Sequence, residues 1–216
     1  MVRIVHFSDW HGYWRDLPPA DLYLCTGDMI KNHTAVSGGK IVVDREETLQ
    51  RVELGTVGSL RKYLGSPSAP VVVVRGNHDY VDLGSSFGGE YFEVNTDSSR
   101  VVEYFGLKIG GYRGAPPVDG WIDGLLPEEI DLALSTIPND LDILVSHGPP
   151  KGILSASFGS KEYFDWFQTR FKQGKRLPKL CCFGHIHEGG GEKIERFGTH
   201  FSNASLGSVI IDLRSK

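Results

Sequence analysis

Cysteine is scarce in this chain of 216 residues, which has three: Cys25, Cys181 and Cys182. Two are adjacent and the third is remote, so the sequence has neither a C-x-x-C spacing nor an even disulfide framework. Cys25 and Cys182 lie in or beside apolar runs, where buried reduced thiols are common. We therefore expect free thiols and a cytoplasmic location, because the cytoplasm keeps thiols reduced.

Long apolar runs and excess positive charge are also lacking. No run approaches the roughly 20 residues of a membrane-spanning helix, and the first residues form no signal peptide, so we expect no membrane association. A net charge of −4 and a pI near 6.1 exclude an electrostatic basis for binding duplex DNA. A small phosphorylated substrate stays possible, because bound cations would reverse the local field.

The composition is that of an ordinary soluble protein, with 40% hydrophobic and 23% charged residues. Glycine and proline are scattered, and we find no linker, repeat or low-complexity tract. We therefore predict a single domain over residues 1–216.

Apolar runs that end in polar turns predict buried strands, and amphipathic stretches between them predict helices. The fold class is therefore α/β with some hairpin content. Helices are predicted over residues 45–63, where Leu49, Val52, Leu60 and Leu64 have broadly helical spacing, and over 127–134 and 160–171. Strands are predicted over residues 2–7, 22–25, 71–74, 100–104, 107–111, 142–145, 180–183, 193–197, 200–203 and 208–213.

Polar islands that contain histidine, aspartate or asparagine follow five of these strands. Such loops at strand ends favour metal ligation. Asp9 and His11 would point to the same side in extended backbone, and Gly27 allows a sharp turn that would let Asp28 bridge two cations. The donor set has no sulfur and suits two divalent ions, Mn²⁺ first, with Fe²⁺ or Zn²⁺ as alternatives. Its members are Asp9, His11, Asp28, Asn77, His147, His185 and His187.

The order D-x-H, G-D, G-N-H-D, H-G and G-H-x-H resembles the calcineurin-like metallophosphoesterases. The resemblance covers nearly the whole chain and implies two packed β-sheets flanked by helices. It assigns one metal to Asp9, His11 and His187, the other to Asn77, His147 and His185, and the bridge to Asp28. It also implies catalytic roles for His78, at the phosphate and leaving group, and for Asp79, which would orient His78.

The implied reaction is attack on phosphorus by a hydroxide that bridges the two metals. The G-D-x-V-D-R-G pattern of protein phosphatases is missing after Asp28. The run from Ser146 to Pro150 and the segment around His187 look most like the small MPPED-type metallophosphodiesterases. That resemblance implies a small phosphoester substrate and a phosphodiesterase, with cyclic nucleotides such as 2′,3′-cAMP as candidates.

Two alternatives stay open. A phosphomonoesterase acting on nucleotides or other metabolites would use the same ligands. A non-catalytic interaction scaffold of the same fold is disfavoured, because all seven ligand positions and His78 are present.

Overall fold

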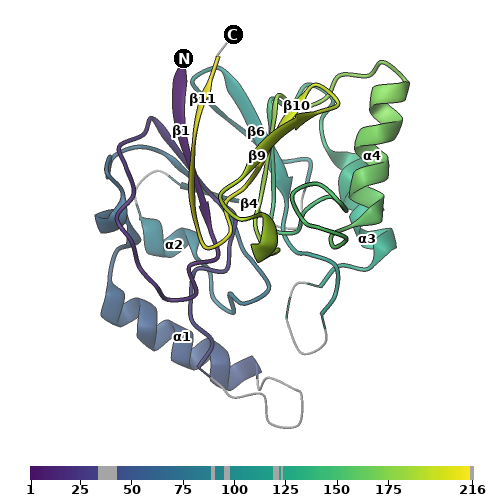
Figure 1. The fold of residues 1–216 in the computed structure, drawn as a ribbon. Coiled ribbons are helices and arrows are strands. Elements are labelled where there is room, and N and C mark those ends of the chain that lie inside the picture. The colour runs from purple at the N-terminus through teal and green to yellow at the C-terminus, as the bar shows by residue number, and fades with distance from the viewer. Residues whose placement is uncertain (34–42, 89–90, 95–97, 119–121, 123, 215–216) are drawn as a thin grey trace.

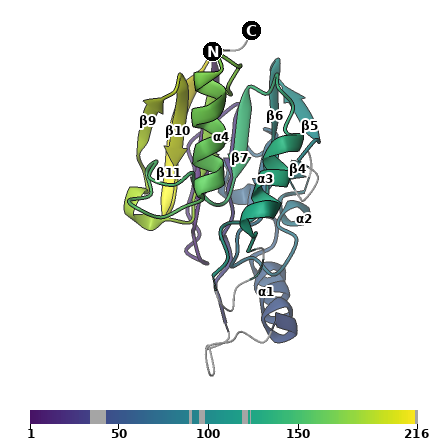
Figure 2. The same cartoon turned by 90° about the vertical axis from the view of Figure 1, so that its right-hand side faces the viewer.

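Two β-sheets pack face to face at the centre of the protein, and helices lie on both outer sides (Figures 1 and 2). The computed structural model describes residues 1–33, 43–88, 91–94, 98–118, 122 and 124–214. The predicted α/β architecture of two packed sheets flanked by helices is confirmed. Its extent as one domain over residues 1–216 stays a prediction.

Each sheet has a parallel centre and at least one antiparallel edge. The first sheet has the order β11 (Gly207–Leu213), β1 (Val2–Ser8), β2 (Leu22–Cys25), β3 (Val71–Val74) and β4 (Tyr91–Val94). The second has the order β5 (Val101–Tyr104), β6 (Leu107–Tyr112), β7 (Ile143–Ser146), β8 (Leu180–Phe183), β10 (Thr199–Asn203) and β9 (Lys193–Arg196). Strands β1 to β4 run parallel, as do β6, β7, β8 and β10. The carboxyl ends of neighbouring parallel strands therefore share an edge of each sheet.

Strands β3 and β8 are apolar at every position because both of their faces are buried. Side chains such as Ile4, Leu24 and Val72 of the first sheet form one core cluster with Ile143 and Val145 of the second. The alternate residues of each sheet face outward and enter two further clusters, which the helices cover.

Helices α3 (Pro127–Thr136) and α4 (Lys161–Lys172) cover the outer face of the second sheet, as Figure 2 shows. Tyr163 and Phe167 of α4 are fully buried there. The short elements η1 (Leu60–Tyr63) and α2 (Gly84–Phe87) contribute Leu60 and Phe87 to the outer cluster of the first sheet. Among the residues described, no helix is both long and apolar enough to cross a membrane. All three cysteines are buried free thiols, as expected.

Helix α1 (Val43–Val57) departs from the prediction in two ways. It ends before Gly58, and η1 is a separate 3₁₀ turn, whereas the sequence predicted one helix over 45–63. The expected apolar face is confirmed only in part: Leu60 and Leu64 are buried, but Val52 is 62% exposed, and the buried residues of α1 itself are Glu46 and Gln50. The physical reason is that this face of α1 contacts polar loops instead of a sheet.

Three elements were missed: α2, β4 and the 3₁₀ turn η2 (His187–Gly189). Each has three or four residues, which is too short to show helical or strand periodicity clearly.

Candidate metal centre

All five polar islands lie at the carboxyl ends of strands and meet where the two sheets face each other. Asp9 and His11 follow β1, Asp28 follows β2, and residues 76–79 follow β3. His147 follows β7, and His185 and His187 follow β8, so the second sheet supplies three imidazoles. The structure thereby brings together residues that lie at opposite ends of the sequence, through strand order alone.

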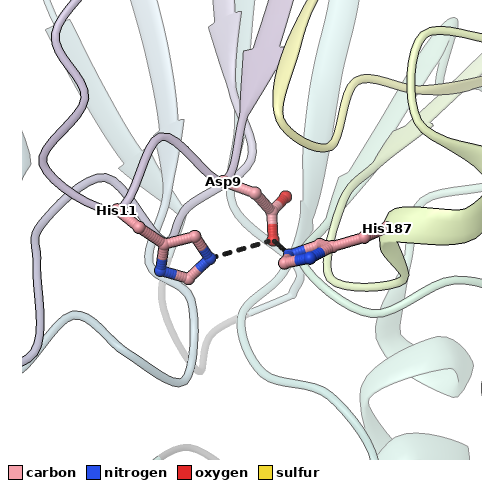
Figure 3. A group of neighbouring side chains, drawn as sticks. All are labelled: Asp9, His11 and His187. Atoms are coloured by element: carbon pink, nitrogen blue, oxygen red, sulfur yellow. Dashed lines mark ion pairs between the residues drawn. The ribbon is translucent and has the colours of Figure 1, made fainter.

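Asp9, His11 and His187 form the first group, with one ligand atom from each lying within 4.8 Å of the others. Figure 3 shows the Asp9 carboxylate between the two imidazoles. Its Oδ1 lies 3.4 Å from His187 Nε2 and 4.0 Å from His11 Nε2. This is the donor set that the sequence assigned to the first metal. The His187 side chain is 43% exposed, so this group opens to solvent.

Asp28, His147 and His185 form the second group, which is deeper and has the same 4.8 Å limit between ligand atoms. His147 Nε2 lies 3.2 Å from Asp28 Oδ2 and 2.9 Å from Asn77 Oδ1. Asn77 therefore joins this group through its amide oxygen, as the sequence assigned it. His147 is fully buried.

Asp28 connects the two groups. Its carboxylate also forms a close set with His11 of the first group and with His78. Each of the two groups supplies one carboxylate and two imidazoles, a nitrogen and oxygen donor set suited to borderline divalent ions. Among the residues described, the buried His11 Nε2 has no hydrogen-bond partner. An unpaired nitrogen beside a carboxylate fits the role of a metal ligand, because buried polar atoms are otherwise paired.

Four of the ligand positions have left-handed backbone. The φ angles are 56° at Asp9, 46° at His11, 53° at Asp28 and 68° at His185. Non-glycine residues adopt this conformation at a cost of about 1–2 kcal/mol, so it clusters where function requires it. The expectation that Asp9 and His11 share a side through extended backbone is therefore wrong in its reason, although the two side chains do meet.

The loops that follow β1 and β2 are bonded to each other. The N–H groups of Asp9 and His11 donate to the carbonyls of Gly27 and Asp28, at 2.9 and 3.0 Å. The irregular backbone at the centre is thereby satisfied, and the ligands of the first group are held in register with the bridging carboxylate.

Glycines beside the ligands permit very close approach. A Cβ atom at Gly76 would lie 2.1 Å from Asp28 Oδ1, and one at Gly184 would lie 2.2 Å from Asp9 Oδ2. Gly27 has a φ of 95°, which confirms the sharp turn expected before Asp28. Gly76 and Gly184 are therefore spatial requirements of the carboxylates that they face.

His147 is oriented by a backbone carbonyl. Its Nδ1 lies 2.7 Å from the carbonyl oxygen of Thr26, which can only accept, so the proton is on Nδ1. Nε2 then faces Asp28 and Asn77, and it is the nitrogen that would ligate a metal after losing its proton. Thr26 in turn contacts the buried His6, whose ring also bonds Ser202 of the second sheet.

The Asp79 carboxylate accepts backbone N–H groups from two loops. Oδ2 accepts from Asp28 and Gly76, at 2.6 and 3.0 Å, and Oδ1 accepts from Met29 and Ile30, at 2.9 and 3.2 Å. These four bonds use the usual acceptor capacity of a carboxylate. Asp79 thus fixes the loop that carries Asp28, and its expected orientation of His78 stays a prediction.

His78 meets a residue that the sequence did not single out. Its Nδ1 forms a short contact with Oδ1 of Asn32, and its Nε2 lies 3.9 Å from Asp28 Oδ2. The backbone N–H of His78 donates to Asp28 Oδ1 at 2.8 Å. The ring is 22% exposed, so a bound substrate can reach it.

Without cations, protons balance the carboxylates. Burial opposes charge on His147, but the Asp28 carboxylate beside it raises the pKa of His147 to about 10. Burial likewise opposes charge on Asp28, yet His147 holds the pKa of Asp28 well below its usual range. A hydrogen bond to Asp9 raises the pKa of His187. The centre thus has carboxylates that attract positive charge strongly, which a divalent ion would supply.

At other members of the centre the effect of burial on the pKa outweighs that of the neighbouring charges. Burial lowers the pKa of His185 to about 4 and also lowers that of His78. Burial, helped by the charge of Asp28, raises the pKa of Asp79 to about 7. His185 is consequently neutral at physiological pH, the form that ligates metal.

A model of the family described as calcineurin-like phosphoesterase matches residues 2–189. The chain belongs to the calcineurin-like phosphoesterase family. The family is one of phosphoesterases, and the His and Asp groups of this chain suggest a dinuclear site for divalent ions.

Two similar proteins show how much of the chain is matched. The UPF0046 protein T07D4.2 of Caenorhabditis elegans is 31% identical over 100% of this chain and 58% of its own length. Metallophosphoesterase domain-containing protein 1 of Homo sapiens is 38% identical over 48% of this chain and 32% of its own. The chain thus spans 58% or less of the length of these two relatives, and the MPPED-type resemblance is confirmed.

A solved structure supports the fold of this chain. The TT1561 protein of Thermus thermophilus has a TM-score of 0.52 at 13% identity, covering 97% of this chain and 88% of that one. At this identity the likeness concerns the fold alone.

Asn32, Gln50 and Thr26 are residues of the centre that sequence reasoning missed. Each contacts a site histidine through a side-chain amide or a backbone carbonyl. Thr26 precedes the G-D motif and could have been found by its position. Asn32 and Gln50 belong to no recognised pattern, and the spacing of Gln50 gave no signal.

Proposed function

We propose that this chain is a dinuclear-metal phosphodiesterase that hydrolyses small phosphodiesters, cyclic nucleotides such as 2′,3′-cAMP among them. The observation that carries the proposal is the pair of donor groups joined at Asp28, in a member of the phosphoesterase family. The MPPED-type motif pattern supports the diester class, and the likeness to the human metallophosphoesterase domain-containing protein 1 supports the broader phosphoesterase class.

Asp9, His11 and His187 would hold one ion, and Asn77, His147 and His185 the other, with Asp28 between them. When bound, two divalent ions lower the pKa of water to give a nucleophile and neutralise phosphoryl charge. The donor set suits Mn²⁺ best in our proposal, with Fe²⁺ or Zn²⁺ as alternatives.

In its cationic form His78 carries a proton on each ring nitrogen, and it would donate the Nε2 proton to the leaving oxygen and keep the Nδ1 proton. The ring is accessible, and Nε2 faces the centre while Nδ1 faces Asn32. Asp79 would orient His78, and its hydrogen bonds to the backbone of residues 28–30 and 76 support this role because they hold both loops in place. A positioned acid of this kind contributes about 10²–10⁴-fold to a rate.

The test compares hydrolysis of bis-p-nitrophenyl phosphate with that of p-nitrophenyl phosphate. The protein is stripped with a chelator and assayed with and without added Mn²⁺, Fe²⁺ or Zn²⁺. We expect metal-dependent turnover that favours the diester. A preference for the monoester would replace the proposal with a phosphomonoesterase, and metal-independent turnover would refute the dinuclear mechanism.

The His78→Ala variant separates catalysis from metal binding. We expect kcat for the diester to fall about 10²-fold or more while both metals are retained, because His78 supplies a proton and no metal ligand. Metal content measured by mass spectrometry is the control. Unchanged turnover at full metal content would contradict the role of His78.

A cytoplasmic location is also part of the proposal. It is supported by the three buried free thiols, which a reducing compartment preserves. Fractionation of cells that express the tagged protein tests it.

A further inference from the structure

Helix α1 buries polar side chains where a helix usually buries apolar ones. Glu46 and Gln50 lie one turn apart and are fully buried. A buried polar group is tolerated when it is hydrogen-bonded, so the partners of these two residues show what the helix holds. In Figure 1, α1 lies below the two sheets, at the end of the molecule away from both termini.

Glu46 holds the segment that follows the Asp28 loop. Its Oε1 accepts the backbone N–H of His33 at 2.8 Å, and a later turn of α1 supplies Glu53, whose Oε2 lies 2.6 Å from Nε2 of His33. The helix therefore fixes both the backbone and the side chain of the residue next to Asn32.

Gln50 holds the loop of His78. Its Nε2 donates to the carbonyl of His78 at 2.7 Å, and its Oε1 accepts from the N–H of Tyr80 at 2.8 Å. The same Nε2 lies 3.4 Å from Oε1 of Glu46. The side-chain amide of Gln50 thus both donates to and accepts from the loop backbone, as a peptide group of a paired strand would. It also bonds to Glu46, so the two buried polar residues of α1 are linked.

The two anchored segments meet at the ring of His78. Asn32 Oδ1 contacts its Nδ1, while Nε2 faces Asp28. We propose that Glu46 and Gln50 are positioning residues, which hold Asn32 and His78 together so that His78 keeps one tautomer and one orientation at the centre. This inference rests on the proposed function in one respect, the catalytic role of His78.

The physical basis is the precision that proton transfer requires. Catalytic groups must be held within about 0.5 Å of their productive position by neighbours that are themselves fixed. A carbonyl oxygen of Asn32 on Nδ1 selects the tautomer with the proton on that nitrogen. Loss of the bonds from α1 would let residues 32 and 78 move independently, so the ring would lose that selection.

The principal variant is Gln50→Met, which keeps the length of the side chain and removes both hydrogen bonds. We expect kcat for bis-p-nitrophenyl phosphate to fall about tenfold with little change in KM, as for outer partners of an active site. In a His78→Ala background the same substitution should cost nothing further, because it acts through His78. Gln168→Met, the same change on helix α4, is the matched control and should leave kcat unchanged.

A second variant covers the case in which Gln50→Met does not fold. Asn32→Ala removes the ring contact without altering α1, and we expect the same fall in kcat and the same loss of effect in the His78→Ala background. The inference would be overturned if either substitution lowered kcat by the same factor in the His78→Ala background as in the parent protein. It would also be overturned if neither substitution lowered kcat.

A readout on the metal-free protein separates this inference from the proposed function. Nitrogen chemical shifts of the His78 ring, assigned by comparison with His78→Ala, report its tautomer. We expect one tautomer with Nδ1 protonated in the parent protein and in Gln168→Met, and a mixture in Gln50→Met. An unchanged ring signal in a folded Gln50→Met protein would overturn the positioning role. If His78→Ala instead kept full turnover, the proposed catalytic role of His78 would be refuted. The ring signal of His78 would still test whether Gln50 positions it.

Discussion

Gly184 is the position where a single methyl group should disable one half of the metal centre. Built on the existing backbone, a Cβ at Gly184 would lie 2.1 Å from Ser8 Oγ and 2.2 Å from Asp9 Oδ2. Both are far below ordinary contact distances of roughly 3.5 Å, so the Asp9 carboxylate would have to move by about 1 Å. The backbone at Gly184 has no positive φ, so the effect of Gly184→Ala is steric.

The expected magnitude follows from what must move. Overpacking of this kind costs about 1–3 kcal/mol of unfolding free energy. Asp9 also accepts the N–H of His185, at 3.1 and 3.0 Å from its two oxygens, so its displacement disturbs a second ligand. Displacement of supporting contacts typically lowers metal affinity by about 10–100-fold, and we expect that loss at the Asp9 group.

The assay combines calorimetric titration of the chelator-stripped protein with Mn²⁺ and urea denaturation of the metal-free protein. The matched control is Gly207→Ala, because a Cβ there would meet nothing within 4 Å. We expect the control to change stability by no more than about 0.5 kcal/mol and to bind metal normally. Wild-type metal affinity and stability in Gly184→Ala would refute the assignment of Asp9 to a tightly enclosed ligand position.

Three further predictions concern charge at the centre. Asp28→Asn should lose metal from both groups, whereas His187→Ala should lose it from the first group alone. Metal content is measured by mass spectrometry, and equal content in the two variants would argue against a bridging role for Asp28. Because the pKa of His147 is raised to about 10, this residue is protonated at pH 7 and must release its proton to bind metal, so affinity should fall as pH falls. Titration heats that do not vary with buffer ionisation enthalpy would contradict this release. Burial lowers the pKa of His6 to about 3 from 6.5, so the unfolded chain binds a proton first and stability decreases as pH falls between these values. At pH 5 the free energy of unfolding that is lost through His6 is about 2 kcal/mol. The free energy of unfolding of His6→Gln, measured by urea denaturation without metal, should therefore depend less on pH below pH 6.5 than that of the parent protein.

The sequence already predicted most of the fold, because the strands of this protein are strong local signals. Val71 to Val74 are four β-branched residues buried on both faces, and the predicted and observed bounds of β3 agree. The run Leu180 to Phe183 behaves in the same way. Such continuous apolar runs identify themselves wherever they occur in the chain, since burial on both faces requires apolar residues at every position.

Helix α1 is the case where a local pattern misled. Leucine and valine at broadly helical spacing indicated an apolar face, yet the helix buries Glu46 and Gln50. Their partners are backbone groups of residues 33, 78 and 80. A polar side chain is buried at low cost only if other groups form hydrogen bonds with it. Here those groups are distant in the sequence, so the residues near position 50 could not indicate them.

For the candidate centre, the sequence alone predicted the types of donor atom, their order along the chain and their place after strands. These followed from motifs such as that of Asn77 and His78. Tertiary structure alone decided the left-handed backbone of Asp9 and Asp28, the four backbone bonds of Asp79 and the contact of Asn32 with His78. The reason is physical: residue type decides what a side chain can bind, whereas strand order, loop φ angles and contacts between distant segments decide what it meets.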